Sequence, residues 1–227
     1  MRLRLVTDAA SEPVTVSELM PFIRVDIDPA DGVMTALIAA ARRRVEKETG
    51  LALMTQTWVA VLDRWPDTVA PDYRNAGLAP GAGLSGWWNG VQQGPQSLIV
   101  PNGIIEIPKR PFLSVTQIQT RDVMTNFSTL DSSTYYTEVS DYMGRIARKP
   151  GAVWPPVPAN MLGCIEITFT CGFGAAAANV PDDLKTAIKM LASHWHEHRE
   201  PVLEGQLNIM PHHVQSILNS WQSLRLR

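Results

Sequence analysis

The residues best suited to chemistry form one histidine-rich run, His194-Trp195-His196-Glu197-His198. His194 and His198 are four residues apart, so on a helix they share one face and could hold a metal ion. The zincin pattern His-Glu-x-x-His is absent, and no third ligand is evident, because His212 and His213 belong to another segment. The run therefore indicates a polar helix face without a metal. A metal-dependent enzyme that uses His194 and His198 is the alternative.

A second candidate is the arginine run Arg42-Arg43-Arg44, which could contact phosphate groups. Arg42 with Glu46, and Arg44 with Glu48, have the i,i+4 spacing of ion pairs on a helix. This spacing favours a solvated helix face, and a nucleic-acid-binding module is the alternative. The net charge of −2 gives the whole chain no general attraction to nucleic acid or to anionic membranes.

Other motifs of catalysis are missing from the sequence. It contains no glycine-rich phosphate loop, no nucleophile elbow and no Cys-x-x-Cys pair. The two cysteines, Cys164 and Cys171, are too few for a disulfide framework, and we expect them to be reduced and half-buried. We therefore predict that the protein is not an enzyme and that it has no catalytic residue, cofactor or metal.

Two amphipathic helices are predicted to carry these runs. The first spans 29–49, with Asp28 placed to cap it, Pro29 at its first position and Gly50 ending it in the left-handed conformation. The second spans 181–199. Their apolar faces each need a partner, so we expect the two helices to pack together: Met34, Leu37, Ile38, Ala41 and Val45 on the first, and Leu184, Ile188, Leu191 and Trp195 on the second.

The remaining pattern predicts an α+β fold. A short helix over 15–24 opens with the capping-box pair Thr15 and Glu18. We expect strands at Thr55–Leu62, Leu98–Val100, Ile104–Ile107, Ser114–Thr120, Tyr135–Val139, Arg145–Ala147 and Cys164–Thr170. The order of elements predicts a helical core, in which the N-terminal and C-terminal helices pack together, with an inserted small antiparallel β module and a C-terminal amphipathic arm.

We divide the chain into four parts: an N-terminal helical part of the core (1–54), the inserted β module (55–175), the C-terminal helix of the core (176–200) and the arm (201–227). Within the module, residues 67–97 form a long loop without periodicity. Its Trp87 and Trp88 are costly to expose and are typical of interface centres, so we predict a partner contact there. A tolerated surface insertion is the alternative. No apolar run approaches the roughly 20 residues that span a bilayer, and residues 1–10 do not form a secretory signal.

The arm contains a third amphipathic pattern. Pro211 suits the first position of a helix, and Arg225 and Arg227 place positive charge at its C-terminal end. Nothing in the preceding domain is obviously reserved for its apolar stripe, which consists of Val214, Ile217, Leu218, Trp221 and Leu224. We predict that this helix docks into a groove on a partner. The alternative is that it folds back on its own domain.

Several stretches, taken in their order and spacing over most of residues 13–200, resemble one protein family. They are Val14-Thr15, Ile23-Arg24-Val25-Asp26, Leu37-Ile38-Ala39-Ala40-Ala41, Glu48-Thr49-Gly50, Gln56-Thr57-Trp58, Leu62-Asp63-Arg64-Trp65-Pro66, Arg110-Pro111-Phe112-Leu113-Ser114-Val115, Gly144-Arg145-Ile146, Trp154-Pro155, Ile165-Glu166-Ile167-Thr168-Phe169, Gly172-Phe173-Gly174 and Val180-Pro181-Asp182-Asp183-Leu184-Lys185. The chain resembles the head–tail connector, or adaptor, proteins of long-tailed bacteriophages and gene transfer agents. Residues 67–97 and the tail after 200 depart from the common pattern.

The resemblance implies a structural virion protein and supplies no catalytic residues. It implies a ring of identical copies, usually a dodecamer, that docks on the portal protein in the particle neck and is assembled in the host cytoplasm. Such a ring continues the DNA channel for ejection, lets double-stranded DNA pass without sequence-specific binding, and receives tail-side stopper or tail terminator proteins. No membrane partner is implied. In this setting, the partner-binding residues that we predict would contact the portal or neighbouring rings.

Overall fold

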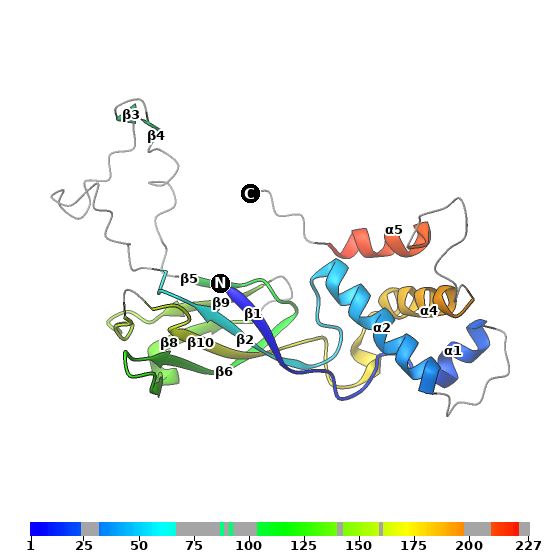
Figure 1. Ribbon diagram of the computed structural model, residues 1–227, viewed down its shortest axis with the longest axis horizontal. Helices are drawn as coiled ribbons and strands as arrows, with labels where there is room; N and C mark the ends of the chain where they lie inside the picture. The colour runs from blue at the N-terminus through cyan, green and yellow to red at the C-terminus, as the bar shows by residue number, and fades with distance from the viewer. Residues whose placement is uncertain are drawn as a thin grey trace.

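The computed structural model describes residues 1–23, 32–66, 104–139, 143–158, 161–197 and 210–222, and the backbone of 87–88 and 91–92. It has the predicted α+β fold: helices gather at one end of an elongated molecule, and antiparallel sheets form the other (Figure 1). The predicted helix start at Asp28 and Pro29 and the predicted strand Leu98–Val100 lie outside the described residues.

Four helices are described: α1 (Val16–Ile23), α2 (Gly32–Thr49), α4 (Asp182–Glu197) and α5 (His212–Trp221). The capping box before α1 is confirmed: the Thr15 amide donates to a Glu18 carboxylate oxygen at 2.9 Å, and the Glu18 amide donates to the Thr15 hydroxyl at 3.2 Å. Gly50 ends α2 with φ of 73°, as predicted. No described helix is long and apolar enough to cross a membrane.

The largest sheet has five strands in the order β1-β2-β10-β6-β7: β1 (Arg2–Thr7), β2 (Gln56–Leu62), β10 (Ile165–Cys171), β6 (Phe112–Arg121) and β7 (Phe127–Thr129). A second sheet has the order β5-β9-β8: β5 (Ile104–Ile107), β9 (Gly144–Arg148) and β8 (Tyr135–Glu138). Trp87–Trp88 (β3) pairs with Val91–Gln92 (β4). Short 3₁₀ turns span Ser132–Thr134 and Ala177–Asn179.

Four strands were not predicted: β1 and β7 of the five-stranded sheet, and β3 and β4 within residues 67–97. Edge strand β1 comes from the N-terminal part and pairs with β2, and edge strand β7 pairs with β6. All β7 residues and all but one of β1 are exposed, so neither strand shows the buried-and-exposed alternation that identified β10. An edge strand forms hydrogen bonds with only one neighbouring strand, and a short local sequence pattern does not reveal that pairing.

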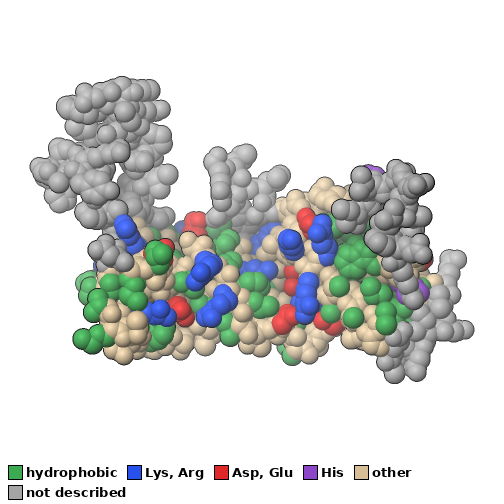
Figure 2. Space-filling model, in the orientation of Figure 1, with side chains coloured by type: hydrophobic (Ala, Val, Ile, Leu, Met, Phe, Trp, Pro, Cys, Tyr) green, Lys and Arg blue, Asp and Glu red, His purple; other side chains and the backbone are tan. Residues whose placement is uncertain are grey.

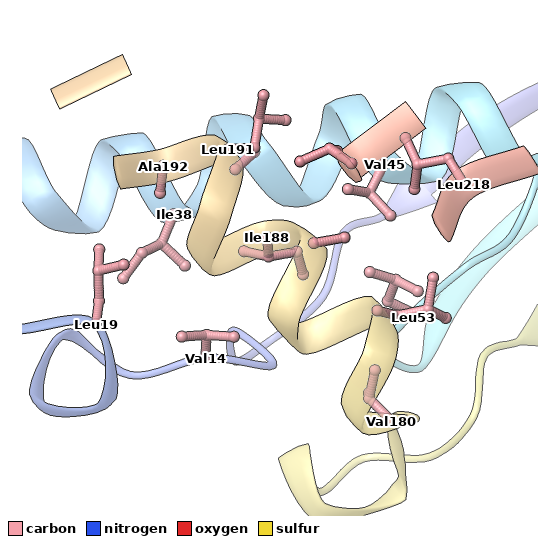
Figure 3. Packing of buried hydrophobic residues seen from close by; sticks show 14 of the residues in the cluster. Val14, Leu19, Ile38, Val45, Leu53, Val180, Ile188, Leu191, Ala192 and Leu218 are labelled. Carbon is pink, nitrogen blue, oxygen red and sulfur yellow. The ribbon is translucent and has the colours of Figure 1, made fainter. Parts of the chain in front are cut away.

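The helices and the sheets have separate apolar cores. The helical core joins α1, α2, α4 and α5, and it contains the fully buried Ile38, Ala41, Val45, Leu184, Ile188 and Leu191, so the predicted packing of α2 on α4 is confirmed (Figure 3). Leu37 and Trp195 are only partly buried and pack at its rim. The β core is centred on Phe112, Phe169 and the stacked pair Trp65 and Trp154.

Candidate functional site

Helices and sheets meet at a junction formed by three segments, 51–55, 109–112 and 171–174. Backbone hydrogen bonds tie the segments together: Ala52 N to Arg110 O (2.7 Å), Gly172 N to Pro111 O (2.9 Å) and Thr55 N to Gly174 O (3.0 Å). The Arg110–Pro111 peptide bond is cis. We call these three segments, together with the Arg42 side chain and its partners Asp8, Glu12 and Glu46, the junction.

Glycine is required at one position of the junction. Gly172 has φ of 134°, and a Cβ atom there would lie 2.3 Å from the carbonyl oxygen of Met54. A side chain would therefore be strained by its backbone conformation and would also collide with a neighbouring backbone. Gly172 lets β10 pass directly against the segment that enters β2.

Arg42 is the centre of the polar contacts at the junction. Its side chain is 2% exposed, and its guanidinium donates to Glu12 (2.7 Å), to Asp8 (3.1 and 3.2 Å) and to Glu46 (3.0 Å). The predicted Arg42–Glu46 pair therefore forms, but the predicted solvated face is wrong for Arg42. Residues that follow β1 cover this turn of α2, which the periodicity of α2 alone does not reveal.

The predicted solvated face is confirmed on the outer side of α2, at Arg43 and Arg44. Arg44 pairs with Glu48 at 2.8 Å, and Arg43 contacts Asp8 at 3.2 Å while its side chain remains 66% exposed. On the face drawn in Figure 2, Lys and Arg side chains are spread along the molecule with acidic side chains among them. The described part of this face therefore shows no single basic patch of the kind that binds nucleic acid.

A chain of hydrogen bonds extends from Arg42 into the sheet. Glu46 accepts from the amide of Leu53 and from the Gln56 amide group, both at 2.9 Å, and Gln56 accepts from the indole of Trp58 at 2.9 Å. Buried polar groups that are fully paired in this way hold a single arrangement, because any shift leaves a buried donor or acceptor unsatisfied. The network therefore fixes α2 relative to β2.

Lys109 adds a buried cation beside this network. Its ammonium group donates to the carbonyl oxygen of Leu51 at 2.7 Å and lies 4.7 Å from the ring centre of Trp58. Burial lowers the pKa of Lys109, and the negative charge of Glu46 opposes this effect only in part. Lys109 thus stabilises the end of α2 and the start of the sheet as one unit.

The charge state of the Arg42 cluster follows from the same geometry. Burial by itself raises the pKa of Asp8, but hydrogen bonds from Arg42 and from the Ala9 amide outweigh it and leave the pKa below its ordinary value. Burial likewise lowers the pKa of Arg42, and the hydrogen bonds to Glu12 and Asp8 outweigh it, so the net shift is upward. Asp8 and Arg42 are therefore both ionised at neutral pH.

Helix α5 docks on its own domain. Val214 and Leu218 are fully buried in the helical core (Figure 3). The Trp221 indole donates to Asp183 at 2.7 Å, and the side chain of Arg110 donates to the Trp221 carbonyl oxygen. The expectation that nothing in the domain is reserved for this apolar stripe is therefore wrong. Amphipathic periodicity shows that a helix packs its apolar face on some surface, but the pattern is the same whether that surface belongs to its own chain or to another protein.

The other predicted contact residues are placed only in part. Ile217 is partly buried against the helical core, and Leu224, Arg225 and Arg227 lie outside the described residues. Trp87 and Trp88 form β3, which pairs with β4, and their role as partner contacts stays a prediction. The structure thus packs the α5 stripe on the helical core, with Trp221 against Arg110 and Phe173 of the junction, and separates it in the fold from β3 (Figure 1).

The histidine run lies on the last turns of α4. His194 and His196 are half-buried, and His198 lies outside the described residues. Among the described residues, no group of three His, Cys, Asp or Glu side chains could hold a metal ion. Cys164 and Cys171 are free, and they are fully buried rather than half-buried. Burial raises the pKa of the Cys171 thiol to about 12.

The sequence analysis missed Asp8, Glu12, Lys109 and Arg110 as residues of the junction. Their partners lie 30 or more positions away, so no local spacing connects them. One signal for burial was present: Arg42 follows Ile38 by four positions and precedes Val45 by three, which places it beside the apolar face of α2. Mutually paired, buried charges of this kind orient structural elements.

Comparison with solved structures shows which fold this is. The structure is similar to chains from the neck of an empty GTA particle computed with C6 symmetry (TM-score 0.70), from the virion of a native gene transfer agent (GTA) particle (0.71) and from the neck of a native GTA particle computed with C12 symmetry (0.66). Each similarity covers 100% of this chain and 98% of the other chain, with 22% sequence identity. No protein-family model and no curated protein matches the chain. The chain therefore has the fold of proteins found in those particles.

Proposed function

We propose that the protein is a structural component of the neck of a phage-like particle, specifically its head–tail connector or adaptor. In this role, copies form a ring that docks on the portal protein, continues the DNA channel and provides the platform for tail attachment. Its partners are then the portal, neighbouring copies, tail-side stopper or terminator proteins, and double-stranded DNA in transit. The ring is assembled in the host cytoplasm and resides in the virion, and the protein acts without catalysis.

The observation that carries this proposal is the extent of the structural likeness. The similarity covers all of this chain and nearly all of each neck or virion chain, so it includes the helices, the sheets and their relative placement. The C6 and C12 symmetries belong to those particles, and they support a ring as the form in which this fold is used. We favour a dodecamer.

The junction suits such a role physically. A neck subunit must hold its shape while a DNA molecule under pressure lies in the channel beside it. In this chain the helical core and the β core are joined by the Arg42 network, by Lys109 and by four backbone hydrogen bonds between segments. These contacts are short and buried, so the two halves behave as one rigid unit.

We propose two contact elements for partner rings. The first is the β3–β4 pair with Trp87 and Trp88, inside the 67–97 insertion. The chain enters this insertion just after Trp65, which is 2% exposed, stacks on Trp154 with ring centres 4.2 Å apart and donates to the Pro155 carbonyl oxygen at 2.8 Å. The insertion therefore begins at a rigid point of the β core, which would hold it at a defined place on a neighbour.

The second proposed contact element is the C-terminal segment, which we assign to the portal. Because Val214 and Leu218 hold α5 in the helical core, the portal contact falls to the residues beyond α5, including Leu224, Arg225 and Arg227. A docked α5 would present this short basic segment from a fixed position. The arginines suit an acidic receptor surface.

The decisive experiment is complementation of particle-producing cells that lack the gene for this chain. We expect filled heads without tails in its absence, and a ring of this chain between portal and tail in cryo-electron images of complemented particles. Tailed, infectious particles without the chain would refute the proposed function.

A second experiment tests the portal contact. Deleting 204–227 would remove two core residues and confuse folding with binding, so the variant of choice removes only 223–227. We expect a folded subunit that no longer joins portal-bearing heads. The matched control is Ser216→Ala, on an exposed position of α5, which should join them normally. Normal head joining by the truncated chain would remove the portal assignment.

A further inference from the structure

The five-stranded sheet has two unpaired edges that carry charges of opposite sign. Its outer strands are β1 and β7, and among the described residues no strand pairs with the outer side of either one. Unpaired strand edges present rows of backbone donors and acceptors that can accept another strand. Three strands, β2, β10 and β6, separate the two edges, so β1 and β7 face away from each other across the sheet.

Apolar side chains are exposed along both edges. On β1, Leu5 is 40% and Val6 is 54% exposed; at the β6–β7 hairpin, Met124 is 76% and Phe127 is 46% exposed. Large apolar side chains that gather at a strand edge indicate a surface that is covered in an assembly. A strand from another molecule would satisfy the backbone and cover these side chains at the same time.

The charges on the two edges are complementary. Residues 1–7 contain two arginines, Arg2 and Arg4, and no acidic residue, whereas the turn between β6 and β7 together with β7, residues 122–129, contains Asp122 and no Lys or Arg. Arg121, which precedes this turn, is engaged by Glu166 at 3.9 Å. Hydrogen bonds from the hairpin amides hold the pKa of Asp122 below its ordinary value. This carboxylate is therefore anionic at neutral pH and suits an arginine-bearing edge.

We propose that β1 of one copy pairs with the β7 edge of the next copy, so that the sheet continues from subunit to subunit. The occupant of each edge is a second copy of this chain, because the chain itself carries both halves of the complementary contact. A contact between two different surfaces of identical subunits repeats around a ring when its rotation closes. The proposal rests on the neck function for its setting and names the subunit contact of the ring.

Pairs of introduced cysteines test this contact. Leu5→Cys and Ser128→Cys place thiols on the two edges, at exposed positions, in one chain. The native Cys164 and Cys171 are fully buried, so the wild-type chain supplies a background that does not react. Purified particles that carry the double variant are treated with a short bismaleimide and analysed on a denaturing gel.

We expect a ladder of dimers, trimers and larger species from the double variant, and monomer from each single variant. The matched control joins Leu5→Cys with Tyr136→Cys, which lies 56% exposed on an edge strand of the other sheet, and it should stay monomeric. Adding Arg2→Glu and Arg4→Glu should abolish the ladder, because like charges would then face each other.

Three outcomes would overturn the edge contact. The first is a double variant that gives no ladder in particles with normal necks. The second is a dimer from Leu5→Cys alone, which shows a symmetric β1–β1 contact, and the third is an equal ladder from the Tyr136→Cys control. If the chain is absent from particles, the neck function fails, and the same treatment of the concentrated, purified chain then decides the edge contact: a ladder supports it, and monomer refutes it.

Discussion

Replacing Arg42 by Met should destabilise the protein far more than the same change at the neighbouring Arg43. Met keeps most of the unbranched stem of the side chain and removes the guanidinium with its four hydrogen bonds. Asp8 and Glu12 have side chains that are 32% and 24% exposed, so water can replace much of the hydrogen bonding that these carboxylates lose. Glu46, at 9%, remains as a buried charge without its cation.

The expected loss in the free energy of unfolding follows from the burial of Glu46. Removing one partner of a buried ion pair costs about 3–5 kcal/mol, and we expect Arg42→Met to lower the free energy of unfolding by this amount. Arg43 is 66% exposed and makes one contact at 3.2 Å, so Arg43→Met should cost about 0–1 kcal/mol. Adding Glu46→Gln to Arg42→Met should recover part of the loss, because it removes the buried charge and keeps an acceptor for Leu53 and Gln56.

Urea unfolding followed by circular dichroism measures these differences. The pKa of Asp8 is lowered in the folded state, so its stabilising effect is present above the ordinary aspartate pKa of 3.8 and is lost as pH falls through the lower folded value. The difference between wild type and Arg42→Met should therefore shrink at acidic pH. An Arg42→Met loss below about 1 kcal/mol at neutral pH, equal to that of Arg43→Met, would refute the account of the junction.

The other predictions concern packing and reactivity. Leu191→Ala should lower the free energy of unfolding by about 2–5 kcal/mol, because Leu191 is fully buried between α4 and α2; a loss below about 0.5 kcal/mol in urea unfolding would contradict this. Gly172→Ala should lower the melting temperature more than Gly50→Ala, since only at Gly172 would the new Cβ meet backbone, at 2.3 Å; calorimetry that ranks them in the reverse order would disprove the collision. The Cys171 thiol, buried and with its pKa raised to about 12, should react with an aromatic disulfide reagent at pH 8 only after unfolding, and rapid stoichiometric reaction of the native chain would show otherwise.

The parts of the fold that could be predicted are those that depend on residues close together in the sequence. The periods of α2 and α4, the capping box at Thr15 and the left-handed Gly50 depend on residues within a few positions of each other, and the structure has all of them. Burial of one face of β10 likewise follows from its alternation, because a strand turns successive side chains to opposite faces. The α+β class followed from the order of these elements.

The tertiary structure decided what each element meets. The α5 stripe would look the same whether it docked on its own domain or on another protein, and only the position of α2 and α4 places Val214 and Leu218 in the chain's own core. Arg42 carries the charge of a surface residue, and it is buried because Asp8 and Glu12, 30 or more positions earlier, cover it. Such contacts depend on the path of the chain through space, which the spacing of residues along the sequence does not record.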